Sequence, residues 1–131
     1  MATEGKKFDK DKLRYDLLPP EPLARVVEVF TIGARKYGDR NWEKGLTWGR
    51  VFAAMMRHAW AWWRGEQYDP EDGQHHLSSV AWCALVLMEY EVTHQELDDR
   101  TIPEYFGKPG PKVPNYNPSD SGIQEPFDAA R

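Results

Sequence analysis

Apolar residues return every three or four positions between residues 22 and 37, which is the spacing of one face of an α-helix. Prolines stand at the start of this run and Gly38 follows its end, as is typical of the two ends of a helix. The apolar stripe consists of Leu23, Val26, Val27, Phe30, Ala34 and Tyr37. The pattern predicts a first helix over residues 22–37 and, because residues 39–45 lack this period, a loop after it.

A second helical period runs from Trp48 to about Arg64. Thr47 is a residue type that caps helix N-termini, and Gly65 is well placed to end the helix. Its apolar stripe is expected to consist of Trp48, Phe52, Met55, Met56, Ala59 and Trp63.

A third helix is expected from about Gly73 to His94, with Asp72 as its N-cap. Between Leu77 and Met88 almost every side of this helix is apolar. A helix that is apolar all round is buried on several sides, and a chain of 131 residues has few helices to surround it. We therefore favour a homo-oligomer.

The rest of the chain is less regular. Residues 12–20 alternate charged and apolar side chains before two prolines and are expected to form an extended arm. From residue 101 onward the chain is rich in proline and has no helical period. These patterns predict an all-α helical bundle with one domain over residues 1–100 and an extended or disordered tail over residues 101–131.

Composition and charge exclude several classes of protein. The formal net charge of -4 gives no electrostatic reason to expect nucleic-acid binding. Cys83 is the single cysteine, so the chain has neither an internal disulfide nor a cysteine-based zinc cluster. The charged N-terminus does not resemble a signal peptide, and no apolar run is long enough to cross a membrane. We therefore expect a soluble protein of the cytoplasm.

The segment between the second and third helices is acidic and contains Glu66, Asp69, Glu71 and Asp72. Carboxylates so close together repel one another unless a cation or a positive group offsets their charge. Hard divalent cations such as Mg²⁺ and Mn²⁺ take carboxylate oxygens as ligands. The same segment also fits a solvated turn in which Asp72 caps the third helix, and the residues alone leave both interpretations open.

Basic and imidazole side chains flank this acidic segment. Arg57 has the planar fork that suits phosphate, although salt bridges to the nearby carboxylates would also satisfy it. His58 flanks the apolar stripe of the second helix, and His76 shares a helical face with Cys83 and Tyr90. A histidine in such a position is more often a hydrogen-bonded core residue than a ligand. Carboxylates and arginine on a helical scaffold nevertheless favour metal-assisted phosphate chemistry.

Three blocks of the sequence, in this order, resemble one known family: LRYDLLP, GARKYGDRNW and RHAWAWWRGEQYDPEDGQHHLSSVAWCALVLMEYE. The family is the phage-associated dATP/dGTP diphosphohydrolase domain, a MazG-like branch of the all-α nucleoside triphosphate pyrophosphohydrolases. The resemblance covers about Lys12 to Glu91 and implies a helical bundle of that type, assembled as a homodimer or homotetramer. It also implies that, with Mg²⁺ or Mn²⁺, the protein converts dGTP or dATP to the monophosphate and pyrophosphate, in an infected host cell if it is phage-encoded.

The resemblance also implies roles for individual residues. It makes Glu66, Asp69 and Glu71 the metal-binding acids, with Glu66, Asp69 and His76 as catalytic residues. Trp42 could stack on the base or simply pack against the protein. Substrate contacts would come from Lys12, Arg14, Lys36, Asn41, Arg57 and His58.

Two functions from other classes stay open on the residues alone. A non-catalytic helical module could bind a protein partner through its oligomeric surface. A nucleotide sensor could bind the same nucleotide without hydrolysing it. Release of pyrophosphate distinguishes the enzyme from both, and tight nucleotide binding distinguishes the sensor from the module.

Overall fold

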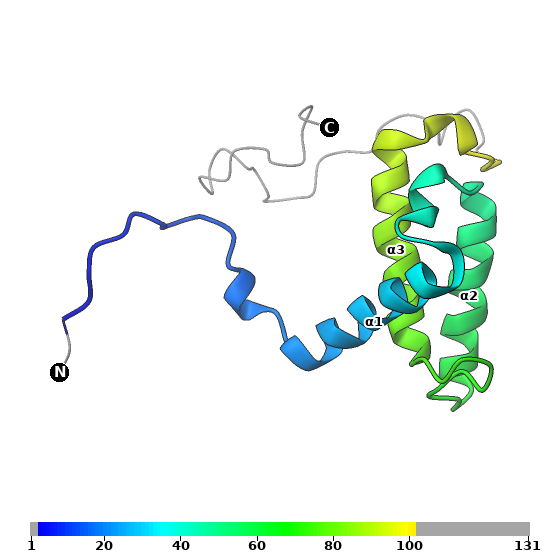
Figure 1. The fold of residues 1–131 in the computed structure, drawn as a ribbon, viewed down its shortest axis with the longest axis horizontal. Coiled ribbons are helices and arrows are strands. Elements are labelled where there is room, and N and C mark those ends of the chain that lie inside the picture. The colour runs from blue at the N-terminus through cyan, green and yellow to red at the C-terminus, as the bar shows by residue number, and fades with distance from the viewer. Residues whose placement is uncertain (1–2, 102–131) are drawn as a thin grey trace. The chain divides into compact units, whose positions relative to one another are not determined.

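The structure is a computed structural model that describes residues 3–101 (Figure 1). The chain divides into two units, one of residues 19–102 and another that includes the N-terminal segment up to Leu18. The regular elements of the described part are helical, which confirms the all-α prediction. None of the described helices is both long and apolar enough to cross a membrane. The tail predicted over residues 101–131 lies, from residue 102 on, outside the described residues.

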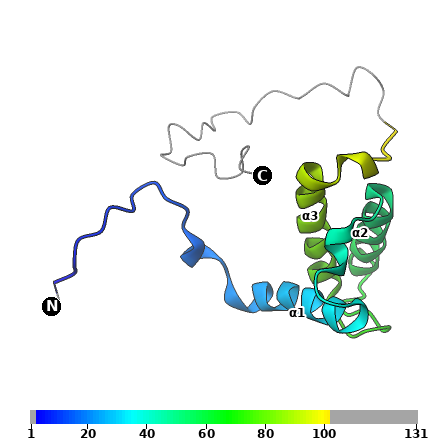
Figure 2. The same cartoon turned by 45° about the horizontal axis from the view of Figure 1, so that its top comes forward.

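The larger unit is built on the helices α1 (Pro20–Tyr37), α2 (Trp48–Trp63) and α3 (His76–Thr93). Two 3-10 turns, η2 (Asn41–Lys44) and η3 (Gln95–Leu97), follow α1 and α3. α2 and α3 lie side by side in opposite directions, and α1 packs against α3 (Figures 1 and 2). The predicted helices are thus confirmed to within three residues at each end.

The core of this unit lies between α2 and α3. Phe30 of α1 and Trp42 of η2 pack against it and meet each other edge to face, with ring centroids 5.9 Å apart. η2 occupies part of the segment predicted as a loop, and its Trp42 anchors that segment to the core. The buried apolar side chains of the core are Trp48, Val51, Cys83, Val86 and Tyr90.

The buried face of α2 differs from the predicted one. Trp48 is buried and Met55 is half-buried as expected, but Phe52 and Trp63 are exposed. Val51, which was not in the predicted stripe, takes a core position. α2 carries apolar residues around much of its circumference, so periodicity alone does not select a face, and the contact with α3 does.

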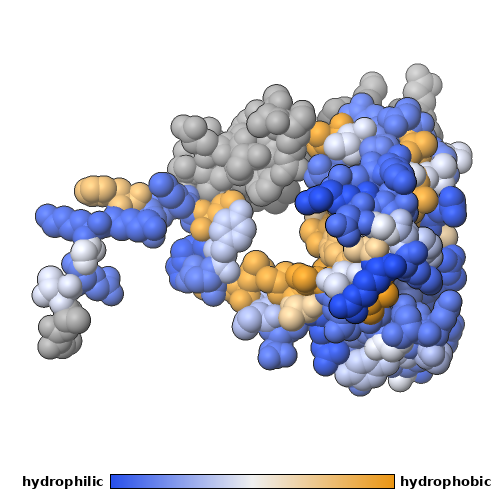
Figure 3. Space-filling view, viewed as in Figure 1, coloured by the Kyte–Doolittle hydropathy of each residue, from blue (hydrophilic) through white to orange (hydrophobic). Residues whose placement is uncertain are grey.

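The apolar stripe of α1 is only partly covered. Phe30 and Ala34 are half-buried, whereas Leu23, Val27 and Tyr37 are exposed. Figure 3 shows apolar surface, coloured orange, along this helix. The helix itself is confirmed, and Gly38 follows its end as predicted, with a φ of 96° that favours glycine.

α3 begins later than predicted and has a different cap. Its first residue is His76, and Nδ1 of His75 accepts a hydrogen bond from the N–H of Leu77 at 3.0 Å. Asp72, the predicted cap, accepts instead from the N–H of Gln74 at 2.9 Å. An aspartate bonds readily to the backbone two residues on, so Asp72 completes the loop before the helix starts.

The segment after α3 folds back on the start of α2. Asp99 accepts a hydrogen bond from the N–H of Gly49 at 2.7 Å, and Nε1 of Trp48 donates to the carbonyl of His94 at 3.0 Å. Gly45 permits this close approach, because a Cβ at that position would clash with the His94 ring.

The N-terminal segment is described by itself. It contains the 3-10 turn η1 (Tyr15–Leu17), where an extended arm was predicted. Arg14 forms a two-pronged hydrogen-bonded ion pair with Asp16, at 2.8 and 2.7 Å, which draws the chain into this turn. All described residues of the segment are exposed.

Candidate active site

A cavity of about 750 Å³ opens among α1, the segment after it, α2 and α3. Phe30 and Trp82 give it apolar walls, and polar side chains such as Lys36, His58 and Gln74 also line it. A cavity of this size, with apolar walls and a few placed polar groups, is typical of a small-molecule site.

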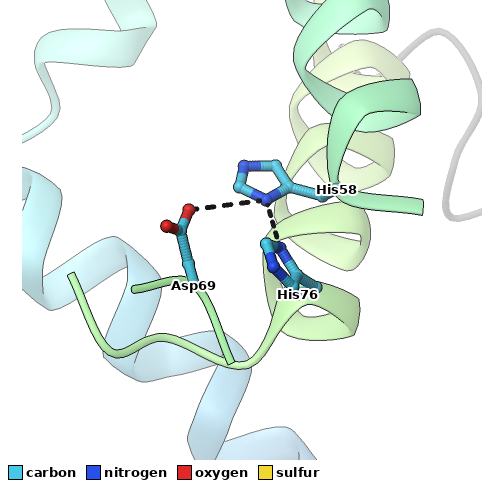
Figure 4. A group of neighbouring side chains, drawn as sticks. All are labelled: His58, Asp69 and His76. Carbon is cyan, nitrogen blue, oxygen red and sulfur yellow. Dashed lines mark hydrogen bonds and ion pairs between the residues drawn. The ribbon is translucent and has the colours of Figure 1, made fainter. Parts of the chain in front are cut away.

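His58, on the cavity wall, belongs to a cluster with Asp69 and His76 (Figure 4). His58 comes from α2, His76 begins α3, and Asp69 comes from the loop between them. The Nδ1 atoms of the two rings lie 2.9 Å apart, and Oδ2 of Asp69 lies 3.9 Å from Nδ1 of His58. One ligand atom from each residue lies within 4.8 Å of the others, which is close enough for all three to share a metal ion.

The loop between α2 and α3 orients Asp69 with its own backbone. An isolated antiparallel bridge closes the loop, and the N–H of Asp69 donates to the carbonyl of Gln74 at 2.8 Å. Oδ1 of Asp69 accepts from the N–H of Glu71 at 2.9 Å, which leaves Oδ2 on the side of His58. The acidic loop is therefore an ordered turn that presents one carboxylate oxygen to the histidines.

His76 is 3% exposed and has a partner at each ring nitrogen. Its Nε2 lies 2.7 Å from Oε1 of Glu66, and its Nδ1 faces His58. Since an ionised Glu66 can only accept, Nε2 of His76 carries the hydrogen, and a neutral His76 presents its Nδ1 lone pair to the cluster. A carboxylate behind a histidine is the arrangement that orients metal-binding histidines in proteins.

The surroundings of His58 favour the neutral form of its ring. Burial is the largest cause that lowers its pKa, and the neighbouring His76 lowers the pKa further, while the Asp69 carboxylate acts in the opposite direction. A histidine binds a metal ion through the lone pair of its neutral form. The electrostatics of His58 therefore match the geometry of a metal ligand.

The predicted metal-binding acids occupy different positions. Asp69 lies in the cluster, whereas Glu66 is half-exposed and contacts His76. Glu71 is exposed and supplies its backbone N–H to Asp69. Among residues 3–101, the group that could hold a metal ion is His58, Asp69 and His76, so direct ligand roles for Glu66 and Glu71 stay predictions.

The predicted substrate-binding residues also fall into groups. Lys36 and Asn41 line the cavity, together with Trp42, which also packs against the core. Arg57 is exposed on α2, next to His58 in the chain. The other two, Lys12 and Arg14, belong to the separately described N-terminal segment.

The sequence marks neither the burial of Gln74 nor the contact between the two histidine rings. Gln74 is 4% exposed, although glutamine is mostly a surface residue, and no spacing marks it as a cavity residue. The residues alone favour core histidines over ligands at His58 and His76, whereas the family resemblance implies a catalytic role for His76 and a substrate contact for His58. The available signal was their position, one on either side of an acidic loop, which allows the two rings to meet when the helices pair.

Comparison with known proteins supplies the family. A family model described as dATP/dGTP diphosphohydrolase, N-terminal, matches residues 2–100, which include α1, α2, α3 and the whole cluster. No curated protein and no solved structure matches the chain. The match confirms the resemblance to dATP/dGTP diphosphohydrolases, while a phage origin stays a prediction. The chain therefore belongs to the dATP/dGTP diphosphohydrolase family, and it is a nucleoside triphosphate pyrophosphohydrolase rather than a non-catalytic module.

Proposed function

We propose that the cavity binds a purine deoxynucleoside triphosphate, dATP or dGTP, and that the protein hydrolyses it to the monophosphate and pyrophosphate with a divalent metal ion. The family match supports the class of substrate. The observation that carries the proposal is the cluster of His58, Asp69 and His76, whose first member lies on the wall of a cavity of about 750 Å³. The cluster would supply groups for a metal ion beside a cavity that has room for a nucleotide.

The donor atoms of the cluster fit a divalent ion. His58 and His76 would each offer a ring nitrogen, and Asp69 a carboxylate oxygen. Such an ion, when bound, polarises phosphate oxygens and lowers the pKa of a water molecule. Two imidazoles beside one carboxylate favour Mn²⁺ over Mg²⁺, because Mg²⁺ takes oxygen ligands.

The protein's own side chains would supply the remaining functions. Hydrolysis adds water across the α–β phosphoanhydride. The water oxygen bonds to the α-phosphorus, and the bridging oxygen leaves with pyrophosphate. Glu66, a half-exposed carboxylate beside His76, would accept the proton that the water releases. Lys36 would offset negative charge on the phosphates, and the walls at Phe30 and Trp82 would accommodate the purine.

The test follows the products of each deoxynucleoside triphosphate, with Mn²⁺ or Mg²⁺, by phosphorus NMR. We expect pyrophosphate from dATP or dGTP, faster with Mn²⁺. Asp69→Asn should reduce the rate by at least roughly 100-fold, whereas Asp98→Asn, an aspartate outside the cluster, is the matched control. Tripolyphosphate as the product would show that the bond to the nucleoside is cut, and no product from either purine would contradict the proposal.

A homodimer or homotetramer is the assembly that the surface of the larger unit favours. α3 exposes Leu77, Leu85, Met88 and Val92, whose spacing places them along one stripe of the helix. An exposed apolar stripe on a single chain gains free energy when a second copy covers it. The predicted burial of α3 on several sides would then be completed by a partner subunit.

A further inference from the structure

Gln74 is a buried residue of the cavity wall whose side-chain oxygen lacks a partner among the described residues. The residue is 4% exposed and lines the cavity. Its Oε1 is buried and has no hydrogen-bond partner among the residues that the structure describes. A buried carbonyl oxygen without a donor is unfavourable, so its retention in a cavity wall calls for a donor that arrives from outside the chain.

The loop holds Gln74 in this position through its backbone. Its N–H donates to Oδ1 of Asp72 at 2.9 Å, and its carbonyl accepts from the N–H of Asp69 at 2.8 Å. His75 and His76, the cap and the first residue of α3, follow at once. With the backbone fixed on both sides, the side chain stays in the cavity although no described protein group binds its oxygen.

The chemistry of Oε1 limits what it can bind. An amide oxygen is a hydrogen-bond acceptor, so it cannot pair with phosphate oxygens, which are acceptors as well. Its partner must carry an N–H or O–H group. On the nucleoside, the donor groups that dATP and dGTP have in common are the amino group of the base and the 3′-hydroxyl of the sugar.

We propose that Gln74 recognises the nucleoside part of the substrate, with Oε1 accepting a hydrogen bond from the base amino group or from the sugar 3′-hydroxyl. The proposal rests on the proposed function, because it takes the cavity as the nucleotide site. Adenine and guanine carry their amino groups at different positions, so a contact to the base would distinguish the two purines, whereas a contact to the 3′-hydroxyl would serve both.

The experiment is a double-mutant cycle between Gln74→Met and substrates that lack one donor. Methionine matches glutamine closely in length and has no carbonyl oxygen. dATP is compared with 2′-deoxyribosylpurine triphosphate, which lacks the amino group, and with 2′,3′-dideoxy-ATP, which lacks the 3′-hydroxyl; dGTP is compared with dITP. Wild type should lose about 3- to 15-fold in kcat/KM when the donor to Oε1 is removed, and Gln74→Met should lose as much with the full substrate.

The combination of variant and analogue decides the outcome. If Gln74 binds the base, the kcat/KM of Gln74→Met should not fall further when the amino group of the substrate is removed. If Gln74 binds the sugar, the kcat/KM of Gln74→Met should not fall further with the dideoxy analogue. An equal loss by Gln74→Met with the full substrates and with every analogue would show a merely structural role and overturn the proposal.

Two further variants and a binding measurement keep the test independent of folding and of turnover. Gln67→Met, an exposed glutamine of the same loop, should behave as wild type with all substrates. Gln74→Glu retains an acceptor oxygen, so it should still discriminate against the same analogue if Gln74→Met fails to fold. Trp42 and Trp82 line the cavity, so quenching of tryptophan fluorescence gives Kd for each nucleotide. Binding with this pattern but without hydrolysis would contradict the proposed function alone.

Discussion

Glu66 illustrates how one carboxylate can matter without lying among the ligand atoms. Its Oε1 is 2.7 Å from Nε2 of His76, on the far side of the ring from the nitrogen that faces His58. Removing the charge of Glu66 would weaken the hold on the orientation and tautomer of His76, and it would also remove the proposed proton acceptor. The same carboxylate would therefore serve two roles, one toward His76 and one toward the attacking water.

We expect Glu66→Gln to reduce metal affinity or activity by roughly 10- to 100-fold while far-UV circular dichroism stays unchanged. Pyrophosphate release, measured across a titration with Mn²⁺, separates weaker metal binding from a lower maximal rate. Glu96→Gln, at an exposed glutamate of η3, is the control. Glu71→Gln tests the role that the family resemblance implies: a loss equal to that of Glu66→Gln would make Glu71 a ligand.

Cys83 offers a prediction about pH that does not involve catalysis. It is 2% exposed, and burial raises its pKa from 9.0 to about 11, because the thiolate is poorly solvated inside the core. At pH 8 the thiolate fraction is then about 100-fold smaller than in the unfolded chain, and it grows about tenfold for each pH unit up to pH 10.

The rate at which iodoacetamide alkylates Cys83 should be proportional to the thiolate fraction. Mass spectrometry at pH 8 should show labelling at least about 100-fold slower in the folded protein than in guanidinium chloride. A folded protein labelled at the unfolded rate would show that the core around Cys83 opens readily.

The sequence indicates the segment that contains the candidate site, but not which of its carboxylates contacts a histidine. Of the crowded carboxylates from Glu66 to Asp72, Asp69 lies in the cluster with the two histidines. Which of them meets a histidine depends on loop hydrogen bonds, such as that from Glu71 to Asp69, that leave no trace in the spacing. Gln74 is invisible for the same reason, since its burial follows from the turn rather than from its residue type.

At the scale of elements, helices were predicted well and their contacts poorly. Periodicity together with glycine and proline placed α1 and α2 to within two residues at each end. The cap of α2, however, comes from Asp99, fifty positions from Gly49 in the chain. A pattern read along the sequence detects local helix signals and cannot detect a partner that only folding brings close.

The start of α2 therefore gives a direct comparison between a local and a distant cap. Thr47 is the N-cap residue, but its side chain makes no capping hydrogen bond. The Asp99 carboxylate accepts from the N–H of Gly49 at 2.7 Å and complements the positive end of the helix dipole. We expect Asp99→Ala to lower the free energy of unfolding by about 1 kcal/mol, and Thr47→Ala by less than half as much.

Urea denaturation of the two variants measures this difference, and the slope against urea should be the same for both. A larger loss of unfolding free energy for Thr47→Ala than for Asp99→Ala would show that Thr47, the residue that the sequence indicates, caps the helix. Equal losses would mean that both side chains cap the helix in solution.

At the scale of the whole molecule, the apolar side chains that the larger unit leaves exposed matter most. α2 exposes Trp60 and Trp63, which are 54% and 72% exposed, and α3 exposes Leu85 and Met88, 45% and 54%. The core of a single chain is correspondingly small, with five buried apolar residues among those described. Burial against another subunit would remove much of this surface from water, which is the main driving force of association.

We expect light scattering after size exclusion to give two or four times the chain mass of 15.2 kDa. The double variant Leu85→Glu with Met88→Glu should weaken self-association by at least about 100-fold, because the interface would have to bury two unpaired charges. Both positions are exposed in the single chain, so its helical content should be unchanged. Phe8→Glu, at an exposed apolar residue of the N-terminal segment, is the matched control. A wild-type monomer would contradict the proposed assembly, and an oligomer that survives the double substitution would move the interface away from the stripe on α3.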